Sequence, residues 1–231
     1  TLEATLVIDH AIEEDKPFFI NLAHYAVHTP IPGQGDPRFL DNYQDPIPGV
    51  ERDYAAMVES MDASLGAVMD HLEERGIADN TIIIFFSDNG GLSNHTRATT
   101  EGDETDRWKR NRHNTPAFSG KGSGYDGGMR VPMIVAWVGD IDSSWENPLV
   151  SGTDTWEPVS AEDLFPTLLA ITGVESPLDD LQRDGIDLIL RFQNKLVGVL
   201  LPRPALFWHY PHQWYNAPQA TREVGIRPFS S

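Results

Sequence analysis

The sequence predicts an α/β fold, with a mostly parallel central sheet flanked by helices. Apolar residues repeat every three or four positions over residues 53–75 and in the stretch "SAEDLFPTLLAITGV", which is typical of amphipathic helices. Between these helices lie uninterrupted apolar runs such as Ile82–Phe86, and a run without polar alternation is typical of a strand that is covered on both faces. Helices that alternate with buried strands define the α/β class.

The start of the chain predicts one helix and one strand. The chain begins with Thr1 instead of a methionine, and we expect that residues precede it in the natural protein, because the first apolar residues are already spaced as one helical face: Leu2, Leu6, Ile8 and Ile12. Residues 18–23, in "PFFINLAHYAVHTP", predict a short buried strand. A loop that contains His24 and His28 follows this strand and is stopped by Pro30.

Further strands and helices are predicted along the rest of the chain. The helix over residues 53–75 should end at Gly76, and the strand Ile82–Phe86 should follow it. The stretch "MRVPMIVAWVG" predicts a second strand, and "ALFWHY" predicts an aromatic one. Between them, "SAEDLFPTLLAITGV" predicts a helix that is capped by Asp163 and has Pro166 in its first turn.

The composition excludes several classes of function. The chain has 17 Lys+Arg against 35 Asp+Glu, a formal net charge of -18, which argues against nucleic acid and against an anionic membrane as the partner. No apolar run approaches the roughly 18 residues that a membrane span needs. Because the sequence contains no cysteine, it has no disulfide, no thiolate metal site and no cysteine nucleophile. An anionic substrate would therefore need a local positive site.

Two polar side chains, Asp88 and Asn89, directly follow the strand Ile82–Phe86 in the stretch "SDNGG". Locally, Asn89 followed by Gly90 favours an ordinary turn. In α/β sheets, however, ligands bind just beyond the carboxyl ends of the strands, where Asp88 and Asn89 are expected to lie. Two adjacent oxygen donors suit calcium or magnesium better than a softer metal. The residues alone leave both alternatives open, a plain turn and a metal site.

The glycine-rich stretch "SGKGSGYDGG" carries a single cation, Lys121. It formally matches G-x-G-x-x-G, but it follows a loop and precedes a strand, which is the reverse of a dinucleotide-binding unit. A phosphate-binding P-loop is also excluded, because Gly122 stands where that motif has Ser or Thr. What remains is a loop whose backbone can approach a ligand closely. Its lysine is either an anion ligand or an ordinary solvated side chain.

The two histidines of "HYAVHTP", His24 and His28, leave more alternatives open. They could be metal ligands, acids or plain loop residues, since histidine suits proton transfer near neutral pH. Two histidines four residues apart without a glutamate companion are not a zinc signature.

Five stretches in order resemble the sulfatase family of the alkaline-phosphatase-like superfamily: "PFFINLAHYAVHTP", "YAAMVESMDASLGAVMDHLEERG", "NTIIIFFSDNGG", "SGKGSGYDGGMRVPMIVAW" and "DLFPTLLAITG". The resemblance implies a calcium-dependent hydrolase of sulfate esters, whose nucleophile is a formylglycine made from Cys or Ser in a C/S-x-P-x-R motif. It further implies that Asp88 and Asn89 bind calcium. Lys121 and His28 look like the catalytic residues that contact the sulfate, and their charge and N–H donor suit the anion that forms in the transition state.

The chain also departs from the family. Asp126 stands where the family often has Glu, and the residues of the family's first half are missing, namely a pair of metal-binding aspartates, the nucleophile motif and a further Lys and His. The chain therefore looks like a single partial sulfatase catalytic domain over residues 1–231, in which residues from about 180 to 231 lead toward the C-terminal subdomain. We expect it to be inactive alone.

The resemblance implies a sulfated small molecule or sulfated carbohydrate as the substrate, and a periplasmic or secreted location is typical of the family. Residues 94–119 could recognise a sulfated sugar by charge, or could be an exposed basic loop that balances an acidic protein; their basic side chains are Arg97, Arg107, Lys109, Arg110, Arg112 and His113. Two other functions stay open. One is a phosphoester or phosphonate hydrolase of the same superfamily, and the other is a truncated paralogue without catalysis.

Overall fold

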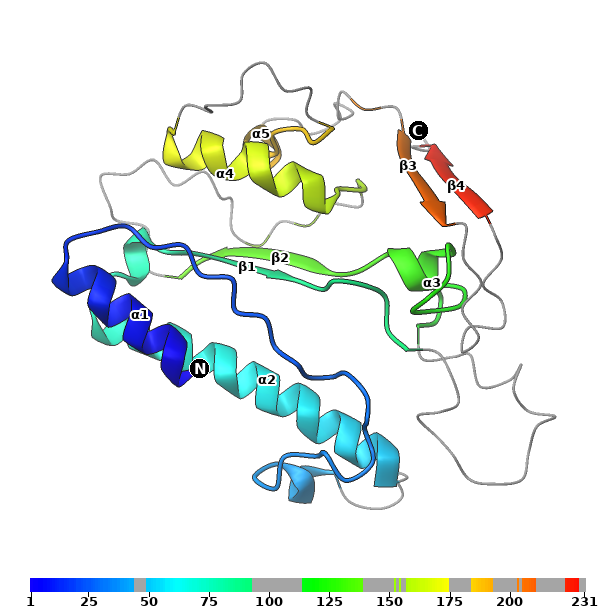
Figure 1. The fold of residues 1–231 in the computed structure, drawn as a ribbon, viewed down its shortest axis with the longest axis horizontal. Helices are drawn as coiled ribbons and strands as arrows, with labels where there is room; N and C mark the ends of the chain where they lie inside the picture. The colour runs from blue at the N-terminus through cyan, green and yellow to red at the C-terminus, as the bar shows by residue number, and fades with distance from the viewer. Residues whose placement is uncertain are drawn as a thin grey trace.

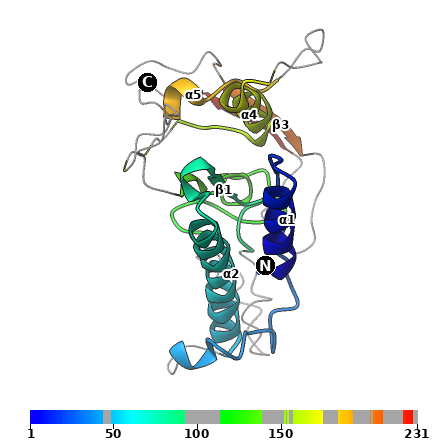
Figure 2. The same cartoon turned by 90° about the vertical axis from the view of Figure 1, so that its left-hand side faces the viewer.

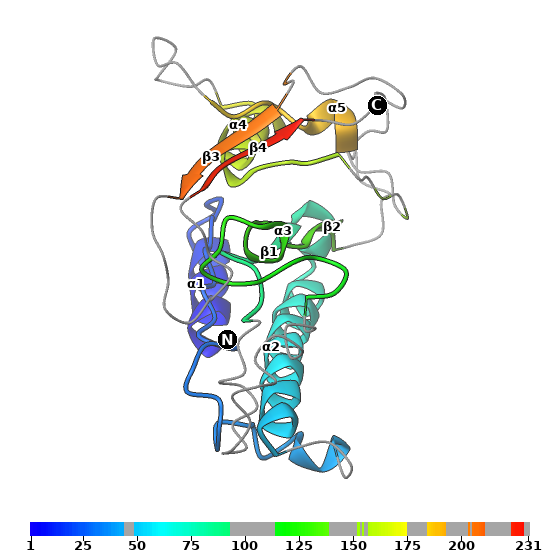
Figure 3. The same cartoon turned by 90° about the vertical axis from the view of Figure 1, so that its right-hand side faces the viewer.

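The computed structural model describes residues 1–43, 49–92, 114–138, 152, 154, 157–174, 184–192, 203, 205–210 and 223–228. Within these residues, a pair of strands lies between two groups of helices (Figure 1). The strands are β1 (Ile82–Phe86) and β2 (Met133–Trp137). On one side lie α1 (Leu2–Glu13) and α2 (Gly49–Glu74), and on the other lie α4 (Leu164–Thr172) and α5 (Ile189–Phe192), as Figure 2 and Figure 3 also show. The other described elements are α3 (Asp126–Met129), β3 (Ala205–Tyr210), β4 (Glu223–Pro228) and the 3-10 helices Leu40–Asn42, Ala78–Asn80 and Ala161–Asp163.

Both described sheets are two-stranded and antiparallel, so the predicted mostly parallel sheet is not found in this part of the chain. In the first sheet, Ile82 of β1 lies opposite Trp137 of β2, and Phe86 lies opposite Met133. β3 and β4 form the second sheet. Every residue of β1 is only half-buried. An uninterrupted apolar run indicates a strand inside the protein. Whether the neighbouring strand is parallel or antiparallel depends on the connection between the two strands, which the run does not encode.

Residues 18–23 do not form the predicted strand. Phe18 and Ile20 pack against the core, whereas Phe19 is 79% exposed and residues 21–23 are all exposed. A strand also needs a hydrogen-bonded neighbour, and no strand of the described chain pairs with this segment. The predicted buried strand is therefore absent among the described residues, and only Phe18 and Ile20 of this segment are half-buried.

Helix α1 is confirmed, but of the apolar face that we predicted only Ile8 is buried. Leu2 and Leu6 are 72% and 58% exposed, and Ile12 is exposed as well. The buried residues are Ala4, Ile8 and Ala11. Ile8 joins the core, and the two small alanines allow α1 to approach its neighbours closely, whereas Leu2, Leu6 and Ile12 lie outside this contact.

Helix α2 is confirmed and ends at Gly76, which has a φ of 68°. The Gly76 N–H donates to Glu73 O at 3.0 Å, and the Ile77 N–H donates to Leu72 O at 3.1 Å. These two bonds satisfy the last carbonyls of the helix, and only glycine adopts this left-handed conformation without strain. The chain then turns into β1, and the core forms at this corner from Ile8, Leu72 and Ala78. No helix of the described chain is long and apolar enough to cross a membrane.

Helix α4 carries Pro166 in its first turn, as predicted, but Asp163 does not cap it with its side chain. The Asp163 carboxylate instead accepts the Ser160 N–H at 2.8 Å, at the start of the preceding 3-10 helix. The sequence could not separate the two helices, because the 3-10 turn continues directly into α4.

An ionic contact joins α1 to the end of α2. Asp9 Oδ1 accepts hydrogen bonds from Arg75 Nε at 2.7 Å and from His71 Nε2 at 2.8 Å. The hydrogen bond from Arg75 lowers the pKa of Asp9 below its ordinary value; burial opposes this effect, and the bond from His71 supports it. The ionised form of Asp9 therefore stabilises the packing of the two helices.

Asp9→Asn should make the stability of the protein less dependent on acid pH. The pKa of Asp9 is lower in the folded than in the unfolded state, where it is about 3.9. Its contribution is complete above the unfolded pKa and is lost as the pH falls through the folded pKa. We expect urea to unfold the variant at a lower concentration than the wild type near neutral pH, and we expect this difference to shrink under acid conditions. Asp70→Asn, at an exposed position of α2, is the control. A difference between wild type and Asp9→Asn that does not change with pH would contradict the prediction.

Candidate functional site

Two backbone hydrogen bonds join the segment after β1 to the glycine-rich segment before β2. The Gly90 N–H donates to Gly128 O at 2.9 Å, and the Lys121 N–H donates to Gly91 O at 3.0 Å. We call this contact, formed by residues 87–91 and 118–128, the glycine junction. It forms because the end of β1 lies opposite the start of β2, so that the two motifs leave the sheet at the same place. The structure thus brings the segment with Asp88 and Asn89 against the segment with Lys121.

Three glycines allow this approach. A Cβ on Gly90 would lie 1.8 Å from Gly127 O, and a Cβ on Gly127 would lie 2.2 Å from Ser119 O. A Cβ on Gly128 would lie 2.4 Å from Ser123 O. From the sequence we expected the glycines of residues 120–128 to let the backbone pass close to another group, and this is confirmed. In the structure, the partner that they approach is the backbone of the other motif or of their own loop.

Asn114 lies outside the two segments of the glycine junction but binds both of them, which the sequence did not reveal. Its Nδ2 donates to Gly91 O at 2.8 Å and to Ser119 O at 3.1 Å, so that one side chain holds both segments. Asparagine is common in loops, and nothing in the surrounding "HNTPAF" distinguishes this one. Its role depends on partners that are remote in the sequence.

The glycine-rich segment is closed at its base and presents Lys121 at its bend. The Phe118 N–H donates to Asp126 Oδ1 and the Gly127 N–H donates to Phe118 O, both at 2.8 Å. The rings of Phe118 and Tyr125 meet edge to face at 4.8 Å. Asp126, the residue that departs from the family, therefore has a local role in closing the loop. Lys121 is half-buried, and its ammonium forms no ion pair with the described residues.

The oxygens of Asp88 and Asn89 are available as ligands. Asp88 is exposed and makes no hydrogen bond or ion pair within the described residues. Asn89 is fixed locally, because its carbonyl accepts a hydrogen bond from Ser87 Oγ at 3.0 Å and its Nδ2 donates to Gly90 O at 3.4 Å. Its Oδ1 thus remains as an acceptor. The turn predicted from Asn89 and Gly90 and the pair of oxygen donors are both present, and they do not exclude each other.

These donors fit calcium in kind and supply part of its shell. Calcium takes about six to eight oxygen ligands, and carboxylate and amide oxygens are typical ones. The described part of the chain contains no group of three or more His, Asp or Glu side chains placed to hold a metal ion. Asp88 and Asn89 could therefore contribute two ligands, and further ligands would have to come from elsewhere.

His28 lies on a different loop, and the described hydrogen bonds do not join it to the glycine junction. Its Nδ1 is 2.9 Å from Thr29 O, and its ring centroid is 5.4 Å from that of Tyr25. Because a carbonyl can only accept, Nδ1 carries a proton, and Nε2 is the acceptor of the neutral ring. His28 is exposed, so Nε2 can accept or return a proton. Residues 94–113, which belong to the stretch that could recognise a sugar or could be an exposed basic loop, lie outside the described residues.

The comparison with known proteins places this site in a family. The family model described as Sulfatase matches residues 3–174. The chain belongs to the sulfatase family. It is 32% identical over 210 residues to a protein named Sulfatase from Formosa agariphila, with 85% of this chain and 33% of that protein covered. It is 30% identical over 208 residues to the N-acetylgalactosamine-6-sulfatase of Mus musculus, with 90% and 34% covered. This sulfatase chain thus spans about a third of the length of these curated relatives.

Solved structures agree with the assignment to the sulfatases. One, described as Ps i-CgsB in complex with k-i-k-neocarrahexaose, matches with a TM-score of 0.69 and 28% identity, over 89% of this chain and 39% of that chain. Another, the PsFucS1 sulfatase from Pseudoalteromonas sp., matches with a TM-score of 0.58 over 99% of this chain and 43% of that chain; at 22% identity it supports the fold alone. The described helices and the small sheet therefore belong to the alkaline-phosphatase-like fold of the sulfatases.

Proposed function

We propose that the protein hydrolyses sulfate esters of a carbohydrate, with Asp88 and Asn89 in a calcium site and with Lys121 and His28 in contact with the sulfate. The observation that supports this proposal most directly is the glycine junction. Its two backbone hydrogen bonds hold a pair of hard oxygen donors and a lysine in touching segments of a sulfatase chain. A strongly acidic protein that binds an anionic ester needs such a local positive group.

The residues of the chain have complementary roles in this reaction. The Lys121 ammonium would stabilise the negative charge that grows on the sulfate oxygens, and a bound calcium would add further positive charge there. Because hydrogen bonds fix the backbone of Lys121 before the substrate arrives, little reorganisation is needed during the reaction. His28 Nε2 can exchange a proton with the leaving alcohol or with water.

The nucleophile is not among these residues. The chain contains no cysteine and no Ser-x-Pro-x-Arg sequence, so it has no precursor of formylglycine. We therefore propose that the chain supplies one part of the active site of a longer sulfatase, and that the chain alone does not turn over a chromogenic aryl sulfate. The names of similar proteins support a carbohydrate as the alcohol of the ester, since one is an N-acetylgalactosamine-6-sulfatase and another was solved with a neocarrahexaose.

Asp88→Ala is expected to weaken calcium binding by the chain by roughly tenfold or more, because it removes the one carboxylate of the pair and with it the charge that attracts the cation. Asn89→Ala should weaken it less, because an amide oxygen is neutral. Isothermal titration calorimetry with calcium and with magnesium measures both effects, with Asp62→Ala on the exposed face of α2 as the control. Equal calcium affinity in wild type and Asp88→Ala would overturn the assignment of the metal ligands.

The choice of ester is tested separately. In the longer protein that carries a nucleophile motif, we expect hydrolysis of aryl sulfates and sulfated sugars to exceed hydrolysis of the matching phosphate esters. A preference for the phosphate ester would favour the phosphoester hydrolases of the same superfamily instead.

A further inference from the structure

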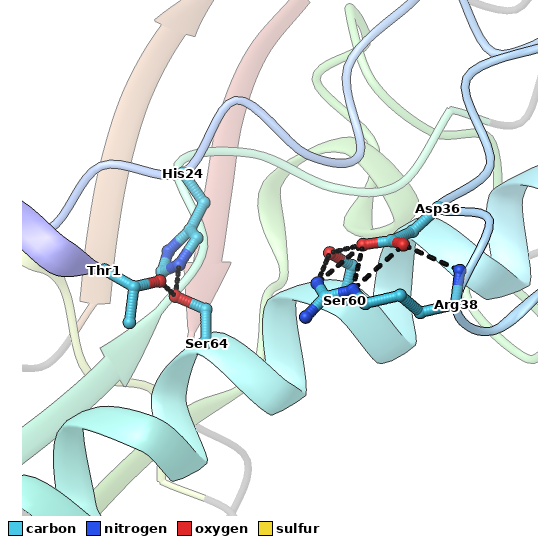
Figure 4. A network of polar contacts seen from close by, with 6 residues as sticks. All are labelled: Thr1, His24, Asp36, Arg38, Ser60 and Ser64. Carbon is cyan, nitrogen blue, oxygen red and sulfur yellow. Dashed lines mark hydrogen bonds and ion pairs between the residues drawn. The ribbon is translucent and has the colours of Figure 1, made fainter.

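The segment that carries His28 is attached to α2 on both sides of this histidine. Before it, His24 Nε2 lies 2.9 Å from Ser64 Oγ. After it, Asp36 Oδ2 accepts a hydrogen bond from Ser60 Oγ at 2.8 Å. Figure 4 shows both contacts along the same side of α2. The two serines are four residues apart and therefore lie about one helical turn from each other.

These two attachments force the segment into a closed loop. Residues 24 and 36 are separated by twelve steps along the chain, which would span about 40 Å if extended. Their contacts on α2 are only about 6 Å apart along the helix. Compact surface loops of this length with neighbouring ends are frequently functional. The interior of the loop is also fixed, because the Gly33 N–H donates to Asp53 Oδ2 of α2 at 2.7 Å and Ile31 is 2% exposed.

We propose that Ser60 and Ser64 are positioning residues, which hold the loop of residues 24–36 on α2 and thereby set the place of His28 for sulfate binding. This inference rests on the role of His28 under the proposed function. Contacts within the loop support it, since His28 Nδ1 and Tyr25 Oη both lie within hydrogen-bond distance of Thr29 O. The ring of His28 is thus fixed to its own loop, and the anchors determine where the loop as a whole is placed.

The Asp36 carboxylate, which forms one of the two attachments, remains ionised near neutral pH. Arg38 donates to the carboxylate through Nη2 at 2.7 Å and through Nε at 3.1 Å. These bonds, together with the Arg38 N–H and Ser60 Oγ, hold the pKa of Asp36 far below its ordinary value. An ionised carboxylate is a strong acceptor for the Ser60 hydroxyl. The attachment therefore does not depend on pH in the range where the protein would work.

Ser64 and His24 are better explained as an attachment of the loop to α2 than as a catalytic pair. A nucleophilic serine needs a histidine that a third group orients. In the described chain, no carboxylate contacts His24, and Ser64 Oγ is shared with Thr1 Oγ1. The pair therefore fits an attachment point better than a nucleophile.

The test removes both hydroxyls, in the variant Ser60→Ala with Ser64→Ala, and follows amide hydrogen exchange. We expect exchange of the amides in residues 25–35 to rise by roughly tenfold, because the loop opens locally. Exchange within α2 should not rise, because alanine is a better helix former than serine. Ser64→Thr keeps a hydroxyl and should retain more protection than Ser64→Ala. Asp62→Ala, an exposed change between the two serines, is the matched control and should leave the loop unchanged.

Turnover by the longer sulfatase separates this inference from the proposed function. We expect the double variant to lose about tenfold or more in kcat/KM, because a displaced group binds the transition state less well. Unchanged amide exchange in residues 25–35 of the double variant would overturn the inference. The inference would also fail if the double variant showed faster exchange but normal turnover, while His28→Ala abolished turnover. If His28→Ala itself leaves turnover unchanged, the proposed role of His28 fails, and the exchange measurement alone decides whether the two serines hold the loop.

Discussion

Gly90→Ala is expected to destabilise the protein by about 3 kcal/mol, the upper range for an added methyl group in a packed region. The new Cβ would lie 1.8 Å from Gly127 O, far inside van der Waals contact, and the obstacle is backbone instead of a flexible side chain. The two segments of the glycine junction would have to separate, which also breaks the hydrogen bond from Gly90 N–H to Gly128 O. Because Asp88 and Asn89 directly precede Gly90, a shift of the backbone at Gly90 should displace these oxygen donors, so calcium affinity should fall along with stability.

Urea unfolding at equilibrium measures the loss, and the chain offers a graded set of controls. Gly66→Ala lies in α2 with nothing within 4 Å of the new Cβ, so it should stabilise the protein by about 0.5–1 kcal/mol. Gly91→Ala should have an intermediate effect, since its Cβ would meet only the side chain of Asn114, at 2.6 Å, which can move. It also remains measurable if Gly90→Ala fails to fold. A cost for Gly90→Ala no greater than that of Gly91→Ala would contradict the close contact between the segments.

The glycine junction shows what the sequence could and could not predict about the site. The residues Asp88, Asn89 and Lys121 were identified from local chemistry and from the order of motifs. The contact between their segments was not, because Gly90 and Gly128 are remote in the sequence and a glycine does not indicate its partner. The same holds for Asn114, and for Ser60 and Ser64, whose partners lie 24 and 40 residues away.

The sequence likewise predicted some parts of the fold and not others. Periodicity predicted α2, β1 and β2 correctly, because helix and strand periods are local properties. It did not predict that β1 and β2 are antiparallel, and it predicted a buried strand at residues 18–23, where the structure has no ladder and only Phe18 and Ile20 are half-buried. In α1 it identified Ile8 correctly, but the other buried residues are Ala4 and Ala11 instead of Leu2, Leu6 and Ile12. Pairing and packing depend on partners that a single segment does not contain.

The Asp163 carboxylate is a buried charge that hydrogen bonds satisfy on both oxygens. It is completely buried, and it accepts hydrogen bonds from the Ser160 and Ile186 N–H groups at 2.8 and 2.9 Å. Arg203, whose side chain is 12% exposed, donates to both carboxylate oxygens at 2.8 Å. One side chain thus joins the start of α4 to the segments before α5 and β3, which are far apart in the sequence.

Asp163→Asn should therefore cost about 3–5 kcal/mol of unfolding free energy, the typical loss when one partner of a buried ion pair is removed. The amide has one acceptor oxygen, and its NH₂ group would face the N–H donors of Arg203 or a backbone N–H, which leaves a buried cation without its countercharge. Asp187→Asn is the matched control, because Asp187 is exposed and, among the described residues, accepts only the Ile189 N–H, at 2.8 Å. Urea unfolding compares the two variants. Replacing both Asp163 and Arg203 by leucine should recover part of the loss but not all of it, since the Ser160 and Ile186 N–H groups would remain buried without an acceptor. Equal stability of Asp163→Asn and Asp187→Asn would show that the buried pair does not hold these segments together.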